Sequence, residues 1–158
     1  MMELKSHLLH LESWAREELA AQRRIMEHVV SQEDALRVND RTAFEDATAA
    51  IQREAEAGLE RNARRDRIVN GIADHYGVAG RHMTLSSVIE RAGDEAGELP
   101  DLRGGLKEAT GDVARRTRRL KRVMGVLRDL NREVLGTVLG DQGTQALETE
   151  GALVDAEA

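Results

Sequence analysis

Cysteine, proline and aromatic residues are nearly missing from this sequence. Its 158 residues include no Cys, one Pro, and one each of Trp, Tyr and Phe. The lack of cysteine excludes disulfides, thiolate metal sites and a cysteine nucleophile. No apolar run approaches the roughly 20 residues of a membrane-spanning helix, and residues 1–7 become charged too early for a signal peptide. We therefore expect a protein with no membrane span, located in the cytoplasm.

Helix-forming residues dominate the rest of the composition. Charged residues make up 33% of the chain and aromatic residues only 2%. Long helices with charged outer faces fit such a composition, whereas a β-sandwich needs more aromatic and β-branched residues. The formal net charge of -6 argues against nucleic acid as the main partner.

Apolar residues recur at steps of three and four over two long segments, about residues 3–38 and 41–76. The pattern breaks at Asn39, and Asp40 is a suitable N-cap for the second helix. Gly77 is a suitable terminator for it. A break of so few residues predicts an antiparallel helical hairpin. The stripes are Leu4, Leu8, Leu11, Ala15, Gln22, Ile25, Val29 and Leu36, then Phe44, Ala47, Ile51, Ala55, Gly58, Ile68, Ile72 and Tyr76.

The pattern changes between the second segment and the next long one. Thr84 can cap a short helix over about residues 84–92. Four glycines follow and predict a flexible connection: Gly93, Gly97, Gly104 and Gly105. Pro100 belongs either to that connection or to the first turn of the last helix, where its missing N–H does no harm.

The last long segment, about residues 101–139, has the most regular apolar spacing. The predicted fold is therefore all-α: an antiparallel three-helix, coiled-coil-like bundle of long helices with a short connecting helix. We expect one domain over residues 1–140. Residues 141–158 hold five acidic and no basic residues, which predicts a flexible acidic tail.

Groupings of residues that could carry chemistry are hard to find. His7 and His10 share a helical face, but none of the five histidines follows a Glu by three residues, as a di-iron bundle requires. No phosphate loop, nucleophile elbow or dinucleotide fingerprint occurs. We expect no catalytic, cofactor-binding or metal site, and hence no enzyme.

Six of the eight residues 115–122 are basic. Such a run could follow nucleic-acid phosphates, pair with acidic faces of the same protein, or remain solvated. No aromatic residue that could stack on bases accompanies it. The run nevertheless suggests an alternative function, that of a helical nucleic-acid-associated protein that uses residues 115–122.

Residues 123–139 carry more apolar surface than a solvent-facing helix needs. One stripe is Val123, Leu127, Leu130, Val134 and Val138, and Met124, Val126, Leu135 and Leu139 widen it. Two readings stay open: core residues that pack on the hairpin, or a surface left for a partner. Glycines within this stretch lower its intrinsic helix stability, which suits folding on binding.

The order and lengths of the predicted helices resemble the FlgN family of flagellar export chaperones over residues 3 to about 140. Three segments carry the resemblance: Leu36-x3-Asp40-x3-Phe44, Met83-Thr-Leu-Ser-Ser-Val-Ile-Glu90, and Leu127-Arg-Asp-Leu-Asn-Arg-Glu-Val-Leu135. Val134 stands where the family often has a second Asn.

The resemblance implies a chaperone for the hook-associated proteins FlgK and FlgL that presents them to the type III export apparatus for flagellum assembly. It also implies client binding near the end of the third helix. With Val123 at the start of the stripe, the expected site is Val123, Leu127, Leu130, Asn131, Val134, Leu135 and Val138. We expect no cofactor, and a monomer or weak self-association. A structural coiled-coil protein is a further alternative.

Overall fold

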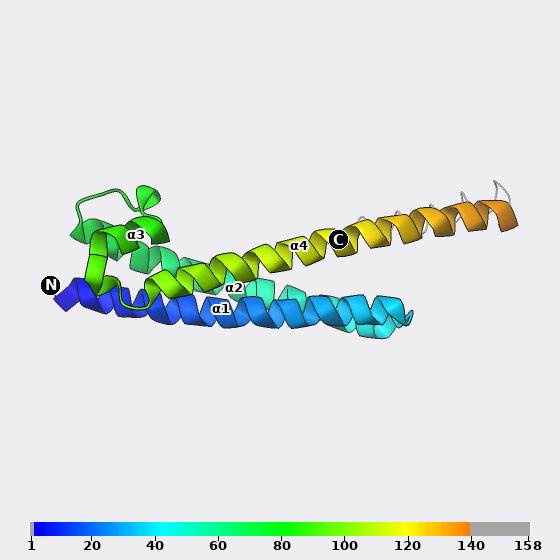
Figure 1. Cartoon of the computed structure of the whole chain (residues 1–158), viewed down its shortest axis with the longest axis horizontal. Helices are drawn as coiled ribbons and strands as arrows, with labels where there is room; N and C mark the ends of the chain where they lie inside the picture. The colour runs from blue at the N-terminus through cyan, green and yellow to red at the C-terminus, as the bar shows by residue number, and fades with distance from the viewer. Residues whose placement is uncertain (1, 140–158) are drawn as a thin grey trace. The chain divides into compact units, whose positions relative to one another are not determined.

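The computed structural model describes residues 2–139, and all regular structure in this range is helical (Figure 1). The elements are α1 (Met2–Arg37), α2 (Arg41–His75), the 3-10 helix η1 (Gly80–His82), α3 (Leu85–Ala92), the 3-10 helix η2 (Gly93–Ala96) and α4 (Leu99–Leu139). This confirms the predicted all-α class. Residues 141–158, predicted to form the tail, lie outside the described range.

The chain divides into two units, one ending at Arg116 and one beginning at Thr117. The boundary falls within α4, so the first part of this helix belongs to the first unit with all the preceding elements. Its remainder, residues 117–139, is described by itself below.

The turn between α1 and α2 depends on two residues with polar side chains. Asn39 has a positive φ of 54°, a conformation that Asn tolerates better than most residues. Asp40 caps α2, because its carboxylate accepts a hydrogen bond of 2.9 Å from the N–H of Ala43. The predicted N-cap is therefore confirmed.

Polar pairs between α1 and α2 define an antiparallel hairpin, because their positions rise along α1 and fall along α2. Arg24 Nε donates to Glu54 at 2.6 Å, and Gln32 donates to Thr48 Oγ1 at 2.8 Å. Nearer the other end, Arg61 Nε donates to Glu18 at 2.8 Å, and both of these side chains are nearly buried, at 13% and 15% exposed. Charged contacts thus occupy the middle of the hairpin, where the sequence offers few apolar residues.

The main hydrophobic core lies at the end of the hairpin opposite the turn. There α1, α2, α3 and the start of α4 bring together fully buried side chains, including Leu11, Ile72, Val88 and Leu99. Burying each such side chain stabilises the fold by roughly 1.5–3 kcal/mol. This core fixes how the connection between α2 and α4 folds.

Two caps shape that connection. Thr84 accepts a hydrogen bond from the N–H of Ser87, and Ser87 Oγ accepts one from the N–H of Thr84, which forms a reciprocal capping box. Gly77 follows the C-cap of α2 with a φ of 64°. Both features follow the sequence prediction.

The flexible connection was predicted to extend to Gly105, and this C-terminal boundary is wrong. α4 begins at Leu99, so Pro100 lies in its first turn, and Gly104 and Gly105 are helical. A Cβ on Gly105 would lie 3.2 Å from Leu19 Cδ2. The lack of a side chain at Gly105 allows α4 to approach α1 closely. Helix propensity, which is low for glycine, does not predict a helical glycine of this kind.

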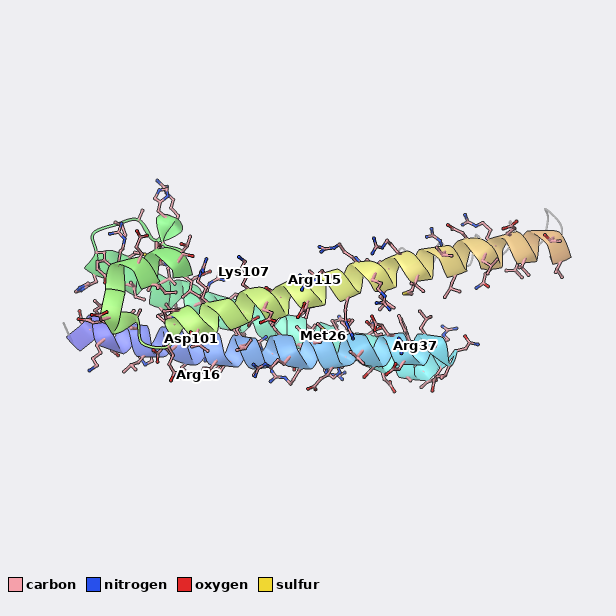
Figure 2. The ribbon with its side chains drawn as sticks, in the orientation of Figure 1. Arg16, Met26, Arg37, Asp101, Lys107 and Arg115 are labelled. Atoms are coloured by element: carbon pink, nitrogen blue, oxygen red, sulfur yellow. The ribbon has the colours of Figure 1, made fainter. Side chains whose placement is uncertain are left out.

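The start of α4 is fastened to α1 by polar contacts. Glu12 is only 9% exposed, and its Oε1 accepts a hydrogen bond of 2.9 Å from the N–H of Glu98. Arg16 pairs with the carboxylate of Glu98 at 2.6 Å; Figure 2 labels Arg16 on α1 and Asp101 in the first turn of α4. Both the N–H and the carboxylate of Glu98, the residue that precedes α4, therefore have partners on α1.

Candidate functional site

Residues 121–138 present apolar side chains to solvent. Every residue from 121 to 138 is exposed except Gly125 and Gly136, which are half-buried. Within the described range, eleven large hydrophobic side chains are exposed, and eight of them lie between Val123 and Val138. Exposed apolar residues scattered singly are ordinary, but a contiguous group on one short segment is a candidate interaction surface.

All seven residues of the predicted site lie in this segment and are exposed. The fractions are 43% for Val123, 38% for Leu127, 52% for Leu130, 51% for Val134, 36% for Leu135 and 72% for Val138, and Asn131 is exposed as well. The partner-binding role of these residues stays a prediction, and their exposed side chains are the feature that the proposal below uses.

Helical geometry brings the seven residues to one side of α4. Each residue turns the helix by about 100°, so the seven fall within an arc of roughly 140°. Met124, which is 40% exposed, falls in the same arc. We call the apolar members the α4 stripe: Val123, Met124, Leu127, Leu130, Val134, Leu135 and Val138. Val126, 67% exposed, lies outside the arc.

The α4 stripe can bury apolar surface but holds no group for acid–base or nucleophilic chemistry. Its one polar neighbour within the arc is Asn131, whose amide can donate and accept hydrogen bonds. A second amphipathic helix laid along the stripe would meet side chains at the usual three-four spacing.

The basic run divides into two parts. Arg115 pairs with Asp112, and Arg116 pairs with Glu33 at 3.5 Å. Arg118, Arg119, Lys121 and Arg122 are exposed and form no ion pair with any residue in the described range. Arg116 thus pairs with an acidic residue of α1, as the intramolecular reading expected, whereas Arg115 pairs within α4.

One ion pair of the hairpin shifts the pKa of a carboxyl group. Arg24 donates a hydrogen bond to Glu54, which lowers the pKa of that carboxyl below its usual value of 4.5. No group of three or more potential metal ligands occurs in this range. Within it, no helix is long and apolar enough to cross a membrane.

A pocket of about 620 Å³ lies beside Trp14, between α1, α2 and the segment that carries η1. Arg65 lies over the Trp14 ring at 5.7 Å from its centroid, and the indole N–H has no protein partner. The sequence analysis did not single out Trp14. Its position three residues after Leu11, on the buried side of α1, would have indicated a core role.

No protein-family model, curated protein or solved structure matches this chain.

Proposed function

We propose that this protein is a non-enzymatic binding protein that holds an apolar, helix-forming segment of a client on the α4 stripe. One observation carries the proposal: the concentration of exposed apolar side chains on residues 123–138. The resemblance of the helix order to the FlgN family supports a specific form of it. The protein would be a cytoplasmic flagellar export chaperone, and its clients would be hook-associated proteins of the FlgK and FlgL kind.

The binding step is an intermolecular helix pairing. The client's apolar face covers the α4 stripe, and Asn131 hydrogen-bonds to a polar group at the edge of the contact. Each Leu-sized side chain that leaves water gains roughly 1.5–3 kcal/mol, less for the part already shielded. Lost translational, rotational and side-chain freedom opposes this gain. A micromolar complex requires a net free energy of about 8 kcal/mol, which a stripe of seven apolar residues can supply.

Placing a charge within the stripe tests the proposal. We expect Leu127→Asp and Leu130→Asp each to weaken binding of a C-terminal FlgK or FlgL fragment by roughly 100-fold, because a carboxylate would be buried against apolar surface. Calorimetric titration of the full chain measures the affinity. Because both positions are exposed, circular dichroism should show unchanged helix content.

A matched control uses the same change at an exposed leucine outside the stripe. Leu59 on α2 is 71% exposed, and Leu59→Asp should leave client binding unchanged. Equal binding by all three variants and the parent protein would show that the stripe is not the client site.

The unpaired cations favour a second candidate, a nucleic-acid-binding helix. In that case the affinity for duplex DNA would fall steeply with salt, with a logarithmic slope of about 0.9 per phosphate neutralised. Replacing Arg118, Arg119, Lys121 and Arg122 by Gln would flatten that slope. A weak and shallow salt dependence in the parent protein would exclude this candidate.

A further inference from the structure

The charged residues around the α4 stripe indicate which class of partner it favours. Residues 117–139 contain six basic and two acidic side chains, a net charge of +4, in a chain whose total is -6. A basic segment on an otherwise acidic protein attracts anionic partners to itself, and the rest of the molecule does not share that attraction. Exposure of the apolar stripe and the local charge therefore point to one partner with both an apolar face and acidic groups.

The charged residues closest to the stripe are all basic. At about 100° per residue, Arg119 lies roughly 20° beyond one edge of the stripe, and Arg128 and Lys121 lie roughly 20° and 40° beyond the other. The acidic side chains, Asp129 and Glu133, lie farther round the helix. Arg128 contacts Asp129 at 3.4 Å, but both side chains are about 70% exposed, so this pair is weak.

This arrangement is that of a helix-pairing seam. In coiled coils, the positions that flank the apolar seam carry the charges that select the partner. Cations on both edges select a helix whose own flanking positions are acidic. Nucleic acid supplies the negative charge but no apolar surface to cover the stripe. Interfacial membrane helices commonly carry Trp or Phe on the apolar face, and residues 117–139 contain no aromatic residue.

We infer that the partner of the α4 stripe is an acidic amphipathic helix, whose carboxylates flank its apolar face and pair with Arg119 on one edge and with Lys121 and Arg128 on the other. This inference rests on the proposed function and adds the electrostatic class of the client. It also gives a role to Arg119 and Lys121 of the basic run.

Three synthetic peptides test the inference on the full chain. They share one Leu/Ala apolar face of about five turns and differ only in the flanking residues, which are Glu, Gln or Lys. We expect the Glu peptide to bind roughly tenfold more tightly than the Lys peptide at low salt. This advantage should shrink as salt is raised, because exposed ion pairs are screened. Fluorescence anisotropy of the labelled peptides measures each affinity.

Charge reversal at the edges supplies the decisive variant. The double variant Arg119→Glu and Arg128→Glu should invert the order and bind the Lys peptide best. The matched control, Arg118→Glu and Arg122→Glu, makes the same change in net charge on the side of α4 away from the stripe. This control variant should still bind the Glu peptide most tightly, because direct ion pairs at the edges of the stripe, and not the total charge, determine the order of the affinities.

The outcomes separate this inference from the proposed function. If all three peptides bind equally, and Leu130→Asp abolishes that binding, the stripe binds helices but the acidic preference is wrong. If no peptide binds, both the proposed function and this inference fail. Edge-dependent binding to vesicles of one part phosphatidylglycerol to three parts phosphatidylcholine, without a preference for the Glu peptide, would assign the surface to a membrane and overturn the inference.

Two further occupants are tested in the same assay. If the preference for Glu appears only after the five acidic residues of 141–158 are neutralised, the chain's own acidic segment is the partner and the inference is wrong. A molecular mass that doubles with concentration and is restored to the monomer value by Leu130→Asp would assign the stripe to a second copy, with the same result.

Discussion

At the residue scale, a few polar and glycine positions decide how the first unit holds together. Gly97 combines a φ of 55° with close contact to the Glu12 carboxylate, the group that accepts the N–H of Glu98. Arg61 and Glu18 form a nearly buried pair in the middle of the hairpin. A side chain at position 97 would collide with the Glu12 carboxylate. Loss of the Arg61 side chain would leave the Glu18 carboxylate without its cation.

Gly97→Ala should destabilise the protein. An alanine would be strained at this backbone conformation, and its Cβ would displace Glu12 from the N–H of Glu98. We expect a loss of about 2–3 kcal/mol in the free energy of unfolding, measured by urea denaturation. Gly104→Ala is the control, because nothing lies within 4 Å of its Cβ position and the residue is helical; it should be neutral or stabilising.

Arg61→Ala should also destabilise the hairpin, because it leaves the carboxylate of Glu18 without its cation in a shielded place. The expected cost is about 3 kcal/mol, near the lower end for a buried pair. Removal of the exposed partner Arg41, which pairs with Glu45, should change the unfolding midpoint far less. If both changes lower the free energy of unfolding equally, burial of the Arg61–Glu18 pair adds nothing to its stabilising effect.

At the element scale, α4 changes character along its length. Its first part contributes Leu99 and Leu106 to the core, whereas residues 121–138 include no buried side chain. Most helical stability in proteins comes from packing of an apolar face and not from propensity. The second part of α4 therefore depends mainly on its own backbone hydrogen bonds.

Gly125 is the position at which that dependence can be measured. No heavy atom lies within 4 Å of a Cβ placed there, so alanine fits without strain. Gly125→Ala should raise the stability of this helical segment by about 1 kcal/mol and slow its amide hydrogen exchange. If folding of the segment is coupled to client binding, client affinity should rise as well. Unchanged exchange rates in the variant would contradict the expected weakness of the segment.

At the scale of the whole molecule, acid should weaken the hairpin. Because Arg24 lowers the pKa of the Glu54 carboxyl in the folded protein, Glu54 stabilises the fold above its unfolded value near 4.5. That contribution is lost as the pH falls through the lower, folded value. Urea midpoints of Glu54→Gln and the parent protein should therefore differ at pH 6 and converge at low pH. A difference that does not depend on pH would contradict the linkage.

The sequence anticipated the elements well because their signals are local. Asp40 and Thr84 cap the helices that follow them, and Gly77 ends α2, since each satisfies or releases backbone groups within one turn. Gly105 was placed in a connection because its reason for being glycine, the approach of Leu19, lies 86 positions away along the chain. The Arg61 pair escaped notice for the same reason, because Glu18 lies 43 positions away along the chain.

By itself, the sequence determined the helical class, the order of the helices and the apolar periodicity of residues 123–138. It could not determine whether that stripe is core or surface, because the 3.6-residue period is the same whichever neighbour buries the face. What only the tertiary structure decided is where the core of the first unit lies, because that depends on contacts between residues far apart along the chain. The core at the far end of the hairpin is filled by α1, α2, α3 and the first turns of α4, and the side chains of the α4 stripe stay exposed to solvent.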